Sequence, residues 1–168
     1  ITVAGGNNVI VGDGEISDGT LAVERLIAAN LDLDDSDDGA DVINSGGGHD
    51  EIRTYDGDDI INSGGGNDVI VAGDGFDVIH GGAGNDDIQG ENDDDTIYGE
   101  AGNDRIDGGN DDDWLYGGSD DDVILGGLGD DILYALRGAD TLIGGEGTNH
   151  LYGGVGDDTY VFVNPAAA

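Results

Sequence analysis

Apolar and polar positions recur with a period of nine along residues 36–161, through fourteen consecutive nonapeptides. The eighth position is always a large apolar residue, namely Ile43, Ile52, Ile61, Ile70, Ile79, Ile88, Ile97, Ile106, Leu115, Ile124, Leu133, Leu142, Leu151 and Tyr160. The three residues centred on it are too few for a helix but suit a short strand whose middle side chain points inward. The positions before them are rich in glycine, which permits the positive φ angles of a tight turn. The pattern therefore predicts three-residue strands alternating with turns.

The sixth position of the repeat carries the candidate chemistry. It is Asp in thirteen repeats and Asn149 in the other. These aspartates are Asp41, Asp50, Asp59, Asp68, Asp77, Asp86, Asp95, Asp104, Asp113, Asp122, Asp131, Asp140 and Asp158. Carboxylates beside glycine turns, which expose main-chain carbonyls, provide the oxygen ligands that Ca²⁺ accepts. The register thus predicts calcium binding.

Two strands and two turns make one coil of 18 residues, and stacked coils predict an all-β fold, a right-handed parallel β-roll. Residues 81–89, Gly-Gly-Ala-Gly-Asn-Asp-Asp-Ile-Gln, show the repeat in full. This sequence resembles the nonapeptide Gly-Gly-x-Gly-x-Asp-x-U-x of the RTX (repeats-in-toxin, hemolysin-type) calcium-binding family, where U is a large apolar residue. The resemblance covers residues 36–161.

The resemblance implies that each Ca²⁺ lies between two turns one coil apart. The earlier turn would supply its Asp and the carbonyls of positions two and four, and the later turn its Asp and the carbonyls of positions one and three. The glycines expected to contribute are Gly64, Gly66, Gly81, Gly82, Gly84, Gly99, Gly102, Gly108, Gly109, Gly117, Gly118, Gly126, Gly127, Gly129 and Gly153. The aspartates fall into two columns of seven turns, so 2 × 6 = 12 calcium ions is the ceiling.

Departures from the repeat identify the weaker sites. Asn149 keeps an oxygen but loses the charge, so the gap between Asp131 and Asn149 should bind more weakly. Residues 135–140 replace the glycine pair and introduce Arg137, which puts both gaps beside Asp140 in question. The turns at 36–39 and 54–57 also lack the glycine pair. Three aspartates replace glycine at position four, and Asp tolerates the left-handed region better than most residues. They are Asp93, Asp111 and Asp120.

Net charge links calcium to folding. The chain of 168 residues carries 39 acidic and 4 basic residues, a formal charge of −35. Such a charge repels nucleic acid and anionic membranes, and with 35 glycines it would ordinarily favour disorder. Bound cations would offset it, so folding and metal binding should be one event. No apolar run approaches the roughly 20 residues that span a bilayer.

Outside the fourteen repeats we expect three further segments. Residues 1–11 resemble a degraded first repeat, residues 12–35 form an insertion, and residues 162–168 form a tail. Within the insertion, an Asp-Gly turn at residues 18–19 favours a hairpin, although residues 24–30 fit a short helix equally well.

Two outward-facing patterns each leave two interpretations open. Tyr98, Tyr116, Tyr134 and Tyr152 are spaced by eighteen and should stack on one face with Trp114 nearby. They form either a ladder that stabilises the sheet or a platform for a sugar or protein partner.

An apolar patch on the other sheet is either a capped end or a docking surface for a next domain. Its residues are Val123, Leu125, Ile143 and Val161.

A catalytic function has little support in the sequence. His49, His80 and His150 occupy different positions of distant repeats, so they do not converge on one site. We expect a non-enzymatic chain that binds calcium and folds by doing so. The resemblance implies a secreted or cell-surface protein exported by type I secretion machinery, with neighbouring domains in a larger chain. The alternatives are a non-catalytic C-terminal domain of a secreted hydrolase or toxin, and a structural spacer or adhesive segment of a giant adhesin or surface-layer protein.

Overall fold

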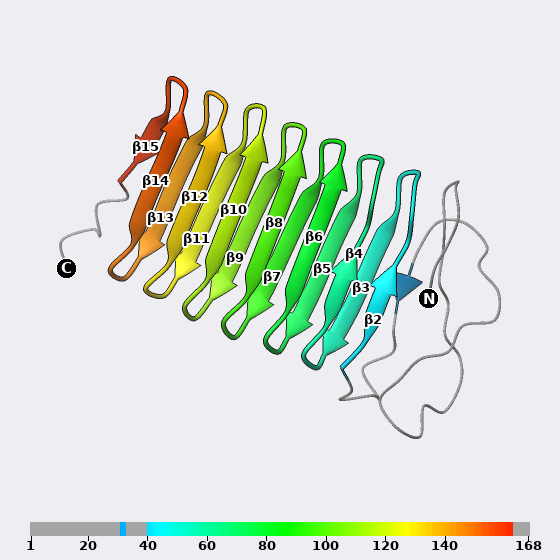
Figure 1. The fold of residues 1–168 in the computed structure, drawn as a ribbon. Helices are drawn as coiled ribbons and strands as arrows, with labels where there is room; N and C mark the ends of the chain where they lie inside the picture. Colours follow the sequence, from blue (N-terminus) through cyan, green and yellow to red (C-terminus); the bar gives the residue numbers. More distant parts are fainter. Residues whose placement is uncertain (1–30, 33–39, 163–168) are drawn as a thin grey trace.

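The strands stack into two parallel sheets that face each other along one straight rod, as the computed structural model shows (Figure 1). The structure describes residues 31–32 and 40–162. One sheet has eight strands in the order β1-β3-β5-β7-β9-β11-β13-β15, and the other has seven in the order β14-β12-β10-β8-β6-β4-β2. The chain alternates between the sheets, and from β2 onward paired residues lie 18 positions apart, as Ile79 and Ile97 do. The predicted parallel β-roll with 18 residues per coil is confirmed.

The strands of the eight-stranded sheet are β1 (Leu31–Asp32), β3 (Glu51–Asp56), β5 (Val69–Asp74), β7 (Asp87–Asn92), β9 (Arg105–Asn110), β11 (Val123–Leu128), β13 (Thr141–Glu146) and β15 (Thr159–Val161). Those of the seven-stranded sheet are β2 (Val42–Asn44), β4 (Ile60–Asn62), β6 (Val78–Ala83), β8 (Thr96–Ala101), β10 (Trp114–Ser119), β12 (Ile132–Arg137) and β14 (His150–Val155). Within the described residues no helix is long and apolar enough to cross a lipid bilayer.

Most strands are twice as long as the sequence predicted. From β5 to β14, each strand runs through positions seven to nine and on through positions one to three of the next repeat. The pairing passes over position one and resumes at positions two and three, as in Gly82↔Glu100 and Ala83↔Ala101. The first half of the glycine segment therefore belongs to the sheet, because its backbone keeps the 18-residue register despite a positive φ at position two.

The core is the column of eighth-position side chains. From Ile52 to Leu142 each is at most 1% exposed, which confirms the predicted inward face. Leu151 is only partly buried, and Tyr160 is 43% exposed at the C-terminal end of the roll. The Tyr160 hydroxyl accepts a hydrogen bond of 2.9 Å from the main-chain N–H of Gly153. The core thus ends where the described coils end.

Positive φ angles occur only at positions two and four among the described residues. At Gly84 a Cβ would lie 1.4 Å from the carbonyl oxygen of Gly66 in the preceding coil. At the same position, however, Asp93, Asp111 and Asp120 adopt φ between 73° and 79°. These turns keep the shape of the others, as expected for Asp in the left-handed region.

The predicted first repeat at 1–11, most of the insertion at 12–35, the turn at 36–39 and the tail from 163 onward lie outside the described residues. Within the insertion, β1 pairs in parallel with β3 and extends the eight-stranded sheet by one strand.

Candidate metal centre

The sixth-position aspartates form two columns along the edges of the roll, where the chain passes from one sheet to the other. From Asp50 to Asp140 each is buried to 3% exposure or less. Asp158, at the C-terminal end, is partly exposed. The stacking places successive aspartates of one column in adjacent coils, which is the alignment that the sequence predicted.

From Asp59 to Asp158, one side-chain oxygen of each sixth-position residue accepts a hydrogen bond from the preceding coil. The main-chain N–H of Asp86 donates to Oδ1 of Asp104 at 2.9 Å, and the same bond links Asp104 to Asp122. In all, twelve such bonds of 2.7–3.2 Å join residues 18 apart, and the last two end on Asn149 and Asp158. This ladder fixes each carboxylate in one orientation.

The other oxygen is buried and has no hydrogen-bond partner in ten of the turns. The ten residues are Asp59, Asp68, Asp77, Asp86, Asp95, Asp104, Asp113, Asp122, Asp131 and Asp140. A buried charged oxygen without a partner costs several kcal/mol, on the order of the desolvation of a single ion. A cation at this oxygen would remove that cost.

Main-chain carbonyls surround the unpaired oxygen. A Cβ added to Gly99 would lie 2.5 Å from Oδ2 of Asp104 and 2.7 Å from the carbonyl oxygen of Gly117 in the next coil. At Gly102 a Cβ would meet the carbonyl oxygen of Gly84 at 1.9 Å, so that carbonyl points from its own coil into the gap before the next.

One gap shows five of the six donors that the repeat predicts. Between the turns at 81–86 and 99–104 lie Oδ2 of Asp86, Oδ1 of Asp104 and the carbonyls of Gly84, Gly99 and Ala101. All of these atoms are oxygens, two of them from carboxylates, and such a set suits Ca²⁺, a hard cation that accepts six to eight oxygens. Among the described residues, no group of three or more Asp, Glu, His or Cys side chains converges on one point. A cation here would therefore depend on main-chain oxygens.

Burial raises the pKa of these carboxyls. The pKa of Asp95 and of Asp113 rises to about 8, chiefly because burial penalises the charged form, against the opposing effect of the main-chain N–H bond. The pKa of Asp77, Asp104 and Asp122 rises to about 7 for the same reason. Without a cation, these groups would hold protons near neutral pH, so at these five turns the folded chain favours either protonation or metal.

The turns that the sequence marked as weaker keep this geometry. In the turn with Arg137, Leu136 takes the positive φ of position two, and Oδ1 of Asp140 still accepts from the N–H of Asp122 at 2.9 Å. In the turn at 54–59, Tyr55 takes a positive φ in the same way.

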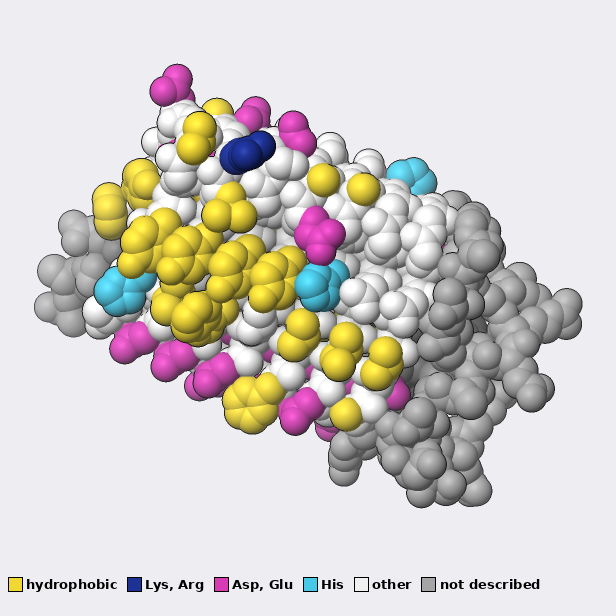
Figure 2. Space-filling model, in the orientation of Figure 1, with side chains coloured by type: hydrophobic (Ala, Val, Ile, Leu, Met, Phe, Trp, Pro, Cys, Tyr) yellow, Lys and Arg dark blue, Asp and Glu magenta, His cyan; other side chains and the backbone are white. Residues whose placement is uncertain are grey.

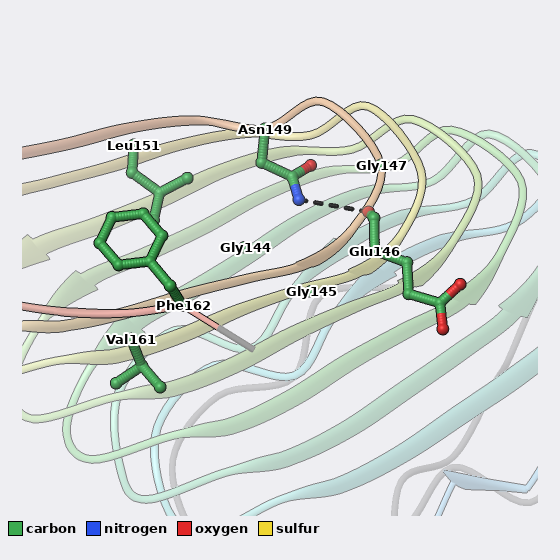
Figure 3. Close-up of a pocket in the computed structure, with 8 residues that line it drawn as sticks. All are labelled: Gly144, Gly145, Glu146, Gly147, Asn149, Leu151, Val161 and Phe162. Atoms are coloured by element: carbon green, nitrogen blue, oxygen red, sulfur yellow. Dashed lines mark hydrogen bonds between the residues drawn. The ribbon is translucent and has the colours of Figure 1, made fainter. Parts of the chain in front are cut away.

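Asn149 differs from the aspartates in one contact. Its Oδ1 keeps the ladder bond from the N–H of Asp131, at 2.8 Å, but its Nδ2 donates to the carbonyl of Glu146 in its own turn, at 3.2 Å. Figure 3 shows this bond at the rim of a cavity of about 590 Å³ at the C-terminal end, lined also by Leu151 and Phe162. The amide thus donates to a main-chain oxygen of its own turn, which a carboxylate could not do.

The predicted aromatic ladder is present on the outer face of the seven-stranded sheet, and it is longer than expected. The rings of Tyr98, Tyr116, Tyr134 and Tyr152 stack at 4.7–5.3 Å, and His80 continues the stack at 4.7 Å from Tyr98 (Figure 2). The spacing of eighteen from Tyr98 could have revealed His80 in the sequence. Because the rings face one another, the stacking occurs within the sheet; binding of a partner stays a prediction.

One known family matches the chain, and its description is the RTX calcium-binding nonapeptide repeat (4 copies). The match recurs at residues 35–70, 62–97, 71–106, 89–124, 98–133 and 125–160. The chain belongs to this family. No curated protein matches the chain. The predicted resemblance is confirmed, and the RTX repeats support calcium binding by this module. Both the repeat family and the roll are structural and calcium-binding in character.

Proposed function

We propose that this RTX module folds by binding Ca²⁺ between successive coils, with the sixth-position aspartates and the carbonyls of positions one to four as ligands. The observation that carries the proposal is the set of ten buried carboxylate oxygens that have no hydrogen-bond partner, several of which lie beside main-chain carbonyls. No other group within the described residues balances these charges. Two of the described arginines, Arg53 and Arg105, pair instead with carboxylates on the outer face of the eight-stranded sheet.

The aspartates bind the cations and also couple each cation site to the next one in the column. Because Oδ1 of an Asp faces the coil before it and Oδ2 faces the coil after it, each carboxylate borders two gaps. An ion bound in one gap would orient the carboxylate that the ion in the next gap also needs. Binding along a column should therefore be cooperative, and it should order the coils that the ions join.

The net charge also supports the coupling of folding to calcium binding, and it indicates where the chain folds. A chain of −35 resists compaction until divalent ions neutralise it. We infer a secreted or cell-surface protein that stays unfolded at low calcium, passes through type I secretion machinery and folds outside, with neighbouring domains that carry any catalytic or adhesive activity. This inference rests on the RTX repeats and the charge of the chain.

The test is far-UV circular dichroism of the calcium-stripped chain during titration with Ca²⁺, with Mg²⁺ at equal ionic strength as the control. A steep rise of β signal with Ca²⁺ alone supports the proposal, because Mg²⁺ demands a small octahedral shell that these spread carbonyls do not offer. A β signal that is already complete in chelator at neutral pH and unchanged by Ca²⁺ would refute it.

A further inference from the structure

The residue at the first position of each nonapeptide changes along the roll. It is Ser or Thr in the first described turns, at Ser45, Thr54 and Ser63, and Gly or Ala in every later repeat from Ala72 to Gly153. The three hydroxyl side chains are almost completely buried, at 0–3% exposure. Of the three, only Thr54 lies in a turn that the sequence analysis identified as lacking the glycine pair.

Each hydroxyl donates to the next coil. Ser45 Oγ bonds the carbonyl of Ser63 at 2.7 Å, Thr54 Oγ1 that of Ala72 at 2.9 Å, and Ser63 Oγ that of Gly81 at 2.5 Å. In all three cases the acceptor is the first-position carbonyl one coil further on. That carbonyl is one of the oxygens that the calcium scheme requires of the later turn.

In the glycine turns the same place lies between two oxygens. A Cβ at Gly90 would be 2.1 Å from Oδ2 of Asp95 and 2.6 Å from the carbonyl oxygen of Gly108, and one at Gly126 would be 2.2 Å from Oδ2 of Asp131. A first-position side chain and a cation in this gap therefore compete for the same oxygens. A first-position side chain can bond the carbonyl of the next coil only where it has a proton to donate.

Eleven gaps lie between turns that are both described, and a hydroxyl spans three of them. In the other eight, the earlier turn begins with Gly or Ala, so no first-position hydroxyl bonds the carbonyl of the later turn. Asp59 and Asp68, in turns that begin with Thr54 and Ser63, keep a buried Oδ2 without a hydrogen-bond partner, as the aspartates of the glycine turns do. The two kinds of gap therefore differ in the first-position carbonyl of the later turn, which the hydroxyl occupies.

We propose that the first-position residue decides how each gap is closed: Gly and Ala leave a calcium site, whereas Ser and Thr replace the ion with a hydrogen bond. Eight of the eleven described gaps then bind Ca²⁺, and the three nearest the N-terminal end hold their coils together without it. This rests on the proposed function and refines it, because it lowers the number of ions below the ceiling of twelve and concentrates them from Asp77 onward.

Two single-oxygen substitutions in adjacent repeats test the proposal. Ala72→Ser adds a hydroxyl on an existing Cβ within reach of the Gly90 carbonyl, and Ser63→Ala removes one. Bound calcium per chain is measured by equilibrium dialysis with atomic absorption, at saturating Ca²⁺. Relative to the unsubstituted chain, Ala72→Ser should bind one ion fewer and Ser63→Ala one ion more, and the double substitution should restore the original number.

The opposite changes would overturn the proposal, because a hydroxyl that ligates calcium would make Ser63→Ala lose an ion. Unchanged numbers in both variants would also overturn it, since a merely structural hydroxyl alters stability alone. If Ser63→Ala does not fold, Ala72→Ser and Ser45→Ala provide the same comparison. An unsubstituted chain that binds no calcium would refute the proposed function itself, which is a distinct outcome.

Discussion

In the absence of calcium, the roll should be stable in mild acid and unstable in mild base. The perturbation is a change from pH 5 to pH 8.5 with the metal stripped. Buried sixth-position carboxyls have folded-state pKa values of about 6 for Asp86, about 7 for Asp104 and about 8 for Asp95, against 3.8 in the unfolded chain. A raised folded-state pKa contributes stability that is complete below pH 3.8 and is lost as the pH rises through 6 to 8.

The magnitude follows from these values. Each pKa unit corresponds to about 1.4 kcal/mol, so between pH 5 and pH 8.5 the loss is about 1 kcal/mol for a carboxyl with a pKa of 6, about 3 at 7 and about 4 at 8. Stability of a typical domain is about 5–15 kcal/mol. Asp95 and Asp113 together could therefore remove most of it.

The assay is urea unfolding of the stripped, dilute chain at the two pH values, followed by circular dichroism and the fluorescence of Trp114. We expect a cooperative transition at pH 5 and no folded baseline at pH 8.5. The calcium-loaded chain should show the opposite slope, because the metal needs ionised carboxylates and protons displace it as the pH falls. Equal calcium-free stability at both pH values would contradict the assignment of these carboxyls as buried and uncompensated.

Three further predictions concern single residues. Asp104→Ala should lose two bound ions, because its carboxylate borders two glycine gaps, whereas the outward Asp87→Ala should lose none and cost at most about 1 kcal/mol; calcium counting by dialysis checks both. Gly84→Ala should strain the turn, since at the present φ of 137° its Cβ would meet the Gly66 carbonyl at 1.4 Å and the backbone must shift toward the φ of 73° that Asp93 adopts; the calcium needed at the folding midpoint should therefore rise. Tyr116→Ala should destabilise the loaded roll by about 1–3 kcal/mol through two lost stacking contacts, seen as a lower thermal midpoint with unchanged calcium stoichiometry.

The features that the sequence predicted are those that repeat. The eighth-position core and the aspartate columns follow from the period alone, because every coil meets its neighbours in the same register. Strand length did not follow, because glycine-rich segments are typical of turns. Only the 18-residue pairing across coils, with residues such as Glu100 in the left-handed region, shows that positions two and three join the sheet.

The chemistry of the first position was hidden for a related reason. In a repeat defined by glycine, Thr54 looks like a departure that weakens a site, and its significance depends on the Ala72 carbonyl 18 residues away. The expectation that a turn tolerates Asp in place of glycine at position four held at Asp93, because its short side chain tolerates a φ of 73°. The ligand assignments themselves stay predictions.

The constant 18-residue register makes the length of this rod adjustable only in whole coils. Removal of residues 81–98 would leave every later residue in its original column. The turn columns, the core positions and the aromatic stack would all continue across the junction. Removal of residues 81–89 alone would exchange the two sheets for every later residue, so that Tyr98 would leave the face that His80 occupies. Duplication or loss of coding sequence in steps of 54 nucleotides would therefore yield shorter or longer rods of the same cross-section, whereas steps of 27 nucleotides would yield rods with scrambled faces.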